Sequence, residues 1–308
     1  MMLKTIHDGN LWLVNQPDHG RIAGYFAAHW GNVQFARPGN YGPSPDPAKL
    51  KAETIFAVAE HDNGWWEWEA NPDLSASDGF PMGLAEVLKD PQAGMDRWRR
   101  GLNRFHESPY ANLLISHHAY WLYAARVLNH PDPAFTHPLF WKGSPEKLYP
   151  GDQAGPLKFI AELEQLQLTW TATLEANPST RDWIRPENLL PHVRLLQLCD
   201  GLSLALTSAL IPARSGQAIG LGQDAFELHD VPRKGWGDRI SIQATPHGVG
   251  QMMLDPYPFD LDPLPVHIPA RIIPLPIKKE PNFYSAWYAH MPNKIEFQFV
   301  SKSFVKNL

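Results

Sequence analysis

Apolar residues recur at intervals of three and four positions over most of the chain, from Pro17 to about Ile211. This spacing places them on one face of an α-helix, so the stretch predicts a helical core over residues 17–211. Several of the predicted helices begin at a proline that follows Asp, Ser or Gly, because proline is well tolerated in the first turn of a helix. The expected helices cover residues 18–30, 47–62, 91–106, 109–125, 156–176 and 186–210.

The two ends of the chain carry patterns that are typical of β-structure. Residues 3–6 and 11–14 flank an Asp8-Gly9 turn signal and predict an N-terminal hairpin. Beyond the helical part, glycines and prolines separate short runs of strand-forming residues, which predict a small antiparallel sheet within residues 212–308. The expected strands cover 240–244, 266–268, 271–273 and 294–300, with a short helix at 285–290.

We therefore expect a mostly α fold, in which a helical bundle is flanked by an N-terminal β-hairpin and a C-terminal antiparallel β region. The chain has 308 residues, a length that allows one large core or two smaller ones. We favour a single compact domain over residues 1–308, because the β-rich ends can complete one folded unit with the helices.

Charge and cysteine content exclude several classes of partner and site. Lys and Arg number 27 against 32 Asp and Glu, so the net charge is −5 and there is no basic stripe for a nucleic-acid backbone. The one cysteine, Cys199, excludes an intrachain disulfide and multi-cysteine metal sites. No apolar run is long enough to span a bilayer, and the N-terminus has no signal pattern. We expect a cytoplasmic protein that binds neither nucleic acid nor membrane.

The sequence also lacks three motifs that mark common enzyme classes. It contains no GxGxxG, no phosphate-binding glycine loop ending in Lys-Ser/Thr, and no Gly-x-Ser-x-Gly. Dinucleotide-binding, P-loop and α/β-hydrolase functions are therefore excluded.

Histidines and aspartates, in contrast, stand where several can meet inside a helical bundle. Asp200 lies in a leucine-rich stretch, where burying a carboxylate is costly unless a cation or hydrogen-bond donors compensate its charge. His19 and His118 fall on the apolar faces of their helices. Imidazole and carboxylate together suit Fe, Mn, Zn, Co or Ni, as one ion or two. The candidate metal ligands are His19, His61, Asp62, His118 and Asp200.

The order of these residues resembles that of a known superfamily. A histidine near the start of one helix, a His-Asp pair at the end of a later one and a distant aspartate are similar to the HD-domain superfamily of metal-dependent phosphohydrolases. The phrases QPDH, HDNGW, PYANLLISHHAYW and CDGLSL resemble the family catalogued as domain of unknown function 3891, over much of the chain including its β-rich tail. The resemblance implies an HD-domain-like helical bundle with His19, His61, Asp62 and Asp200 as ligands and His118 as an additional one.

These features predict a metal-dependent hydrolase of phosphate esters that uses a metal-activated water. The expected substrate is a small molecule, a nucleotide or a small phosphorylated metabolite. Asp62 would position the water or accept its proton, with His61 and His118 completing the catalytic group. A guanidinium can grip two phosphate oxygens, and an indole can stack on a substrate ring. The candidate substrate-binding residues are Arg194, Trp65 and His117.

Two other functions agree with the same residues. HD scaffolds also support di-iron oxygenases, which need two further histidines, here from His106, His117 and His118. The second alternative is a non-catalytic regulatory module that binds a metal or ligand without turnover, and a homo-oligomer is compatible with any of the three. Each residue also has a purely structural interpretation, because buried histidines are commonly hydrogen-bonded core residues and Trp65 is a typical core side chain.

Overall fold

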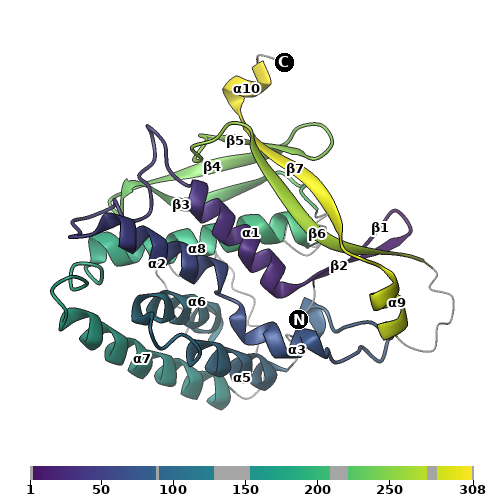
Figure 1. Ribbon diagram of the computed structural model, residues 1–308, viewed down its shortest axis with the longest axis horizontal. Helices are drawn as coiled ribbons and strands as arrows, with labels where there is room; N and C mark the ends of the chain where they lie inside the picture. Colours follow the sequence, from purple (N-terminus) through teal and green to yellow (C-terminus); the bar gives the residue numbers. More distant parts are fainter. Residues whose placement is uncertain (1–2, 88–89, 128–152, 209–220, 276–282, 307–308) are drawn as a thin grey trace.

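The computed structural model describes residues 3–87, 90–127, 153–208, 221–275 and 283–306 (Figure 1). Helices form the lower part of the molecule in this view, and a curled half-barrel sheet of seven strands lies above them. The expectation of a mostly α fold is corrected to a mixed α/β structure, because the two β-rich ends of the chain build one large sheet together.

The long helices that the apolar spacing predicts are present, and most of their ends lie within a few residues of the expected positions. α2 and α5 begin where Asp46 and Asp90 accept hydrogen bonds from backbone N–H groups three residues further on. α8 continues through Pro191. The predicted helix end at 209–210 lies outside the described residues. The helices are α1 (Gln16–His29), α2 (Pro47–Ala59), η1 (Asn63–Trp65), α3 (Trp66–Ala70), α4 (Leu84–Val87), α5 (Pro91–Leu102), α6 (Pro109–Val127), α7 (Ala154–Glu175), α8 (Pro186–Thr207), α9 (Phe283–Ala289) and α10 (Lys302–Lys306).

The described strands form one sheet in the order β1-β2-β6-β7-β5-β4-β3. The N-terminal hairpin joins the C-terminal strands because β6 is long enough to pair twice, antiparallel to β7 along its first part and antiparallel to β2 along its last part. The predicted strands 266–268 and 271–273 are therefore one continuous strand. β5 and β7 run parallel, so the expectation of a purely antiparallel arrangement is wrong for this pair. The strands are β1 (Leu3–His7), β2 (Asn10–Val14), β3 (Phe226–Gly235), β4 (Asp238–Pro246), β5 (Gln251–Asp255), β6 (Leu264–Pro274) and β7 (Asn293–Ser301).

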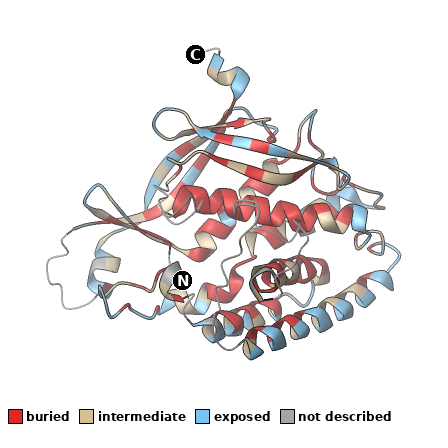
Figure 2. Ribbon diagram, turned by 180° about the vertical axis from the view of Figure 1, so that it is seen from behind, coloured by how far each residue is buried: buried red, intermediate tan, exposed pale blue. Residues whose placement is uncertain are grey.

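α8 lies at the centre of the packing. Every residue from Pro191 to Thr207 is buried, and the helix is largely red in Figure 2. A helix that is buried on all sides needs neighbours on all sides, and α1, α2, α6 and β3 contact it here. An acidic residue in the middle of this helix is therefore enclosed by other elements and must find its partners among them.

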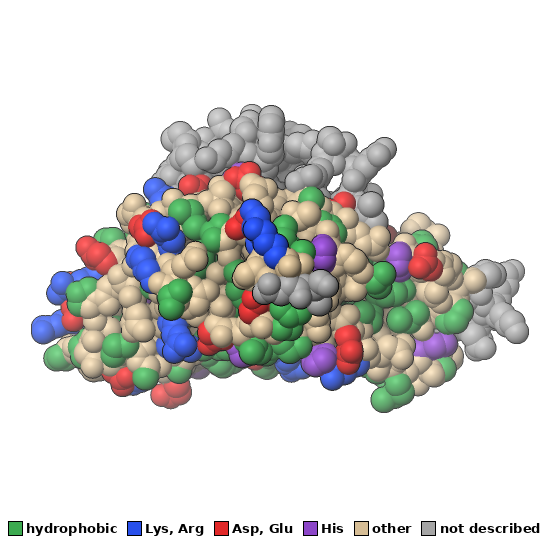
Figure 3. All heavy atoms as spheres, turned by 90° about the horizontal axis from the view of Figure 1, so that it is seen from above, with side chains coloured by type: hydrophobic (Ala, Val, Ile, Leu, Met, Phe, Trp, Pro, Cys, Tyr) green, Lys and Arg blue, Asp and Glu red, His purple; other side chains and the backbone are tan. Residues whose placement is uncertain are grey.

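On the face that Figure 3 shows from above, Lys and Arg side chains are interspersed with Asp and Glu, and they form no large patch of one charge there. None of the described helices combines the length and the apolar character that crossing a membrane requires.

Candidate metal centre

Two glycines let α1 and α2 cross in close contact beside the site. A Cβ atom at Gly20 would lie 2.8 Å from the Ala59 carbonyl oxygen, and one at Gly24 would lie 2.6 Å from the Ala59 Cβ. Both distances are shorter than van der Waals contact, so the crossing requires glycine at these positions. The crossing brings the ring of His19 against that of His61, with centroids 5.0 Å apart.

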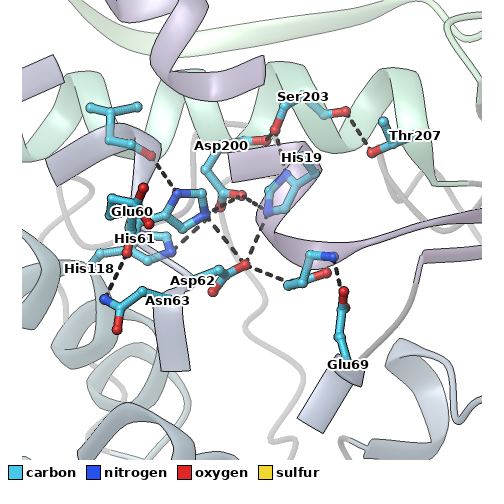
Figure 4. A network of polar contacts seen from close by, with 12 residues as sticks. His19, Glu60, His61, Asp62, Asn63, Glu69, His118, Asp200, Ser203 and Thr207 are labelled. Carbon is cyan, nitrogen blue, oxygen red and sulfur yellow. Dashed lines mark hydrogen bonds and ion pairs between the residues drawn. The ribbon is translucent and has the colours of Figure 1, made fainter. Parts of the chain in front are cut away.

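The turn after α2 orients the His-Asp pair. The Asn63 side-chain amide donates to the Glu60 carbonyl oxygen at 2.9 Å, which holds the chain as it passes from α2 into η1. Neighbouring residues inside a helix point about 100° apart, but beyond a helix end the backbone can turn both side chains the same way. His61 and Asp62 accordingly point toward the same place, between α1 and α8 (Figure 4).

α8 and α6 supply the remaining two side chains. Asp200 Oδ1 lies 3.4 Å from His61 Nε2 and 3.7 Å from His19 Nε2. His118 approaches the other carboxylate oxygen, with its Nε2 atom 3.6 Å from Asp200 Oδ2. Asp62 Oδ2 completes the group at 3.0 Å from His19 Nε2 and 3.5 Å from His61 Nε2. All five side chains that the sequence singles out as ligands therefore meet in one cluster, and none of the five residues is more than 7% exposed.

The hydrogen bonds behind the rings determine what the cluster faces. His61 Nδ1 donates to the Val58 carbonyl oxygen at 2.8 Å. His19 Nδ1 donates to Ser203 Oγ at 2.6 Å, since the hydroxyl proton of Ser203 goes to a backbone carbonyl. Both neutral rings then present an Nε2 lone pair to carboxylate oxygens, so that acceptors face acceptors. A proton or a metal cation between them makes this arrangement favourable. His61 Nε2, in agreement, is buried and forms no hydrogen bond within the described part of the chain.

The carboxylates also raise the proton affinity of His61. Burial by itself would lower the pKa of His61, but the neighbouring Asp62 and Asp200 carboxylates outweigh it and raise this pKa to about 9. Burial would raise the pKa of Asp62, and the positive charge of His61 and His19 lowers it instead. The cluster therefore has the electrostatic character of a cation site.

The donor atoms are close enough to share one ion. His19, His61 and Asp200 each offer one ligand atom, and these atoms lie within 4.8 Å of one another. Imidazole nitrogen and carboxylate oxygen are ordinary ligands of divalent transition metals. Asp62 and His118 adjoin the same atoms. The residues present therefore fit a transition-metal ion, and the cluster can bind one.

The predicted substrate-binding residues Arg194 and Trp65 have other partners. The Arg194 guanidinium donates to the His229 carbonyl oxygen at 2.7 Å and to Gln197 Oε1 at 2.8 Å, which ties α8 to β3. Trp65 is 6% exposed, and its ring lies 4.3 Å from the Arg97 guanidinium carbon of α5. Phosphate contact by Arg194 and ring stacking by Trp65 stay predictions.

The two other histidines considered from the sequence lie elsewhere. His117 is half-buried and points about 100° around α6 from His118. His106 is exposed in the turn between α5 and α6. The contacts that define the cluster include neither of them, and substrate binding by His117 stays a prediction.

Two residues that sequence analysis missed hold the cluster in place. Gln16 Nε2 donates to Asp62 Oδ2 at 2.7 Å, and Ser203 Oγ accepts a hydrogen bond from His19 Nδ1. Each lies three positions from a candidate ligand of its own helix, Gln16 before His19 and Ser203 after Asp200, so each shares that ligand's face. A polar residue at this spacing on an otherwise apolar face is the signal that identifies such partners.

The sequence matches the family described as "Protein of unknown function (DUF3891)" over residues 1–275. The chain belongs to this family. The DUF3891 match includes all five residues of the cluster and strands β1 to β6, and α9, β7 and α10 follow it. No curated protein and no solved structure matches the chain. Its function is therefore argued from the cluster itself.

Proposed function

We propose that this DUF3891 protein is a metal-dependent hydrolase of phosphate esters, acting on a nucleotide or a small phosphorylated metabolite. The observation that carries the proposal is the buried cluster in which His19, His61 and Asp200 converge. A histidine, a His-Asp pair and a distant aspartate on separate helices are similar to the arrangement of HD-domain phosphohydrolases. That likeness supports this reaction class over others that use the same ligand types.

The residues of the cluster have distinct roles in this reaction. A bound divalent cation supplies Lewis acidity, which promotes deprotonation of water and polarises a phosphoryl oxygen. Asp62, held by a hydrogen bond from the Gln16 side chain, orients the attacking water and accepts its proton. His118 Nε2, on the Asp200 Oδ2 side, holds a proton for the leaving oxygen. His61 keeps its Nε2 directed at the ion through its bond to a backbone carbonyl.

One ion agrees better with the cluster than two. A di-iron oxygenase of this type needs two histidines besides those already assigned. Of the candidates, His106 is exposed and His117 is half-buried on another side of its helix. Of these three candidates, only His118 approaches a carboxylate of the cluster, that of Asp200. These positions support a mononuclear site and the hydrolase over the oxygenase.

Metal analysis of the purified protein tests the ligand assignment. We expect about one transition-metal ion per chain in the natural protein and a large loss of metal in Asp62→Ala and Asp200→Ala. Asp260→Ala is the matched control, because Asp260 also pairs with a histidine of α1, accepting from His29 Nδ1 at 2.9 Å, but lies partly exposed. Unchanged metal content in both cluster variants would show that the ligand assignment is wrong.

A panel of phosphate esters tests the reaction. The metal-loaded protein is expected to release inorganic phosphate from at least one member, and His61→Ala is expected to abolish this while the far-ultraviolet circular dichroism stays unchanged. Bound iron with oxygen consumption in place of phosphate release would favour the oxygenase. Full metal loading without turnover on the whole panel would favour a binding module.

A further inference from the structure

A pocket of about 370 Å³ opens at the N-terminal end of α1. α1, α3, β6 and α9 contribute its walls. Two arginines, two tryptophans and two carboxylates are among the side chains that line it: Arg21, Arg271, Trp66, Trp287, Asp18 and Glu69. A pocket with positive groups beside flat apolar surfaces has the composition of a small-molecule site.

Two hydrogen bonds join this pocket to the metal cluster. Glu69 Oε1 accepts the backbone N–H of Gln16 at 2.7 Å, and the Gln16 side chain donates to Asp62 Oδ2 at 2.7 Å. One residue therefore separates the lining of the pocket from a candidate ligand. Glu69 Oε2 and Gln16 Oε1 are both enclosed without a hydrogen-bond partner among the described residues. Buried polar atoms of this kind are costly unless a ligand satisfies them.

The environment of Arg271 is the second observation that points to a ligand. Its guanidinium lies over the ring of Trp287, 3.6 Å from the centroid, and its Nε donates to the His290 carbonyl oxygen at 3.1 Å. The side chain is half-buried, yet no carboxylate in the described ranges forms an ion pair with it, whereas several other arginines pair in this way. The Asp18 carboxylate, which also lines the pocket, attracts this guanidinium electrostatically without forming an ion pair with it. A half-enclosed guanidinium that is not ion-paired is suited to hold an anion through two parallel hydrogen bonds.

We propose that this pocket binds the substrate before its phosphoryl group reaches the metal centre, with Arg271 holding the phosphate group and Glu69 donating a hydrogen bond to it. The inference rests on the proposed function and gives it a substrate class. Trp66 and Trp287 offer indole surfaces to a flat ring, so the substrate is a phosphate ester that carries an aromatic or heteroaromatic ring. Burial raises the pKa of Glu69 to about 8, which keeps its carboxyl protonated at neutral pH and able to donate.

Binding of phenyl phosphate to the full chain tests the pocket, because this probe joins a phosphate to one flat ring. Isothermal titration calorimetry at pH 7, with and without added metal, is expected to show binding that Arg271→Gln weakens at least tenfold. Arg239→Gln is the matched control, since Arg239 also lies over an indole, that of Trp236 at 4.4 Å, on the distant β3–β4 hairpin. We expect it to change the affinity less than twofold. Should Arg271→Gln fail to fold, Glu69→Leu is expected to weaken binding about fivefold.

The outcomes separate this pocket from the metal centre. Two results would contradict the proposal that this pocket binds the substrate: equal affinities of Arg271→Gln and Arg239→Gln for the probe, or no binding of the probe by the natural protein. Probe binding that depends on Arg271 in a protein that takes up no metal would support the pocket and contradict the proposed hydrolase. Metal uptake that depends on Asp200, with no effect of Arg271→Gln on binding of the probe, would support the metal centre and contradict the pocket as its substrate site.

Discussion

Two fully buried histidines of this protein, His61 and His192, lie in opposite electrostatic situations. His61 uses one ring nitrogen to bond a backbone carbonyl and directs the other at two carboxylates, which raise its pKa to about 9 despite burial. His192 accepts the backbone N–H of Gly39 at Nε2, 2.9 Å away, and donates from Nδ1 to the Tyr110 hydroxyl oxygen at 2.7 Å. Burial without a charged partner lowers its pKa to about 3.

The difference separates a candidate ligand from a structural histidine. Both nitrogens of His192 are satisfied by neutral groups, so the ring needs neither a proton nor a metal and joins the 31–46 loop, α6 and α8. In the His61 site, acceptor atoms converge and a positive charge is required. Burial and residue type are the same in the two cases, so the partners of the two ring nitrogens are what indicate function.

The largest expected effect concerns metal affinity. His61→Gln is expected to weaken metal binding more than a hundredfold, beyond about 2.7 kcal/mol, because it removes a candidate ligand rather than an outer partner. His192→Gln should change the same affinity less than threefold. Competition with a chromophoric chelator measures both. Equal losses of metal affinity in the two variants would show that His61 is no more a metal ligand than His192.

The free energy of unfolding, in contrast, should depend on His192. His192→Ala is expected to lower the free energy of unfolding by about 2.5 kcal/mol, since it leaves the Gly39 N–H buried without an acceptor and opens a cavity. His267→Ala, at an exposed position of β6, serves as the control and should cost less than about 0.5 kcal/mol. Urea unfolding at pH 7 measures both, and a loss for His192→Ala no larger than that of the control would contradict its structural role.

The lowered pKa of His192 should make the free energy of unfolding depend on pH in the acid range. Its pKa is about 6.5 in the unfolded chain and about 3 in the folded protein, so below pH 6.5 the unfolded state binds more protons and stability falls as pH falls. Between pH 6.5 and pH 5 this group removes about 1.6 kcal/mol of stability. His192→Gln should lack that part of the pH dependence in urea unfolding measured at both pH values. Parallel curves for the natural protein and the variant would show that the His192 pKa is not lowered.

The smallest effect is expected for an outer partner of the cluster. Ser203→Ala removes the acceptor of His19 Nδ1 and should weaken metal binding about tenfold, about 1.4 kcal/mol. Ser116→Ala is closely matched, because Ser116 is also buried in a helix and donates to the carbonyl oxygen three residues earlier, that of Leu113. Chelator competition is expected to show less than a twofold change for Ser116→Ala. Similar changes in both serine variants would mean that Ser203 does not orient His19.

Much of the site could be anticipated from the sequence, because a buried carboxylate or imidazole in an apolar helix needs a partner. Asp200 among leucines and His19 on an apolar face illustrate this, and both lie in the cluster. The prediction for Arg194 rested on its closeness in sequence to Asp200, whereas six positions along a helix turn the two side chains to different sides. Besides Gln197 of its own helix, Arg194 bonds backbone groups of β3, which only packing brings to it.

The sequence by itself determined the helices, because helical hydrogen bonds join residues four positions apart and the apolar spacing reports the buried face directly. It also determined which side chains were candidates for the metal site. Tertiary structure decided that both β-rich ends form one sheet, since Leu11 pairs with Ile273 from nearly the other end of the chain and no local pattern encodes that partner. It decided as well which ring nitrogen faces the carboxylates. For His61 that choice depends on the Val58 carbonyl three residues earlier in the chain, whereas for His19 it depends on the Ser203 hydroxyl, which only the packing of α8 against α1 brings to the ring.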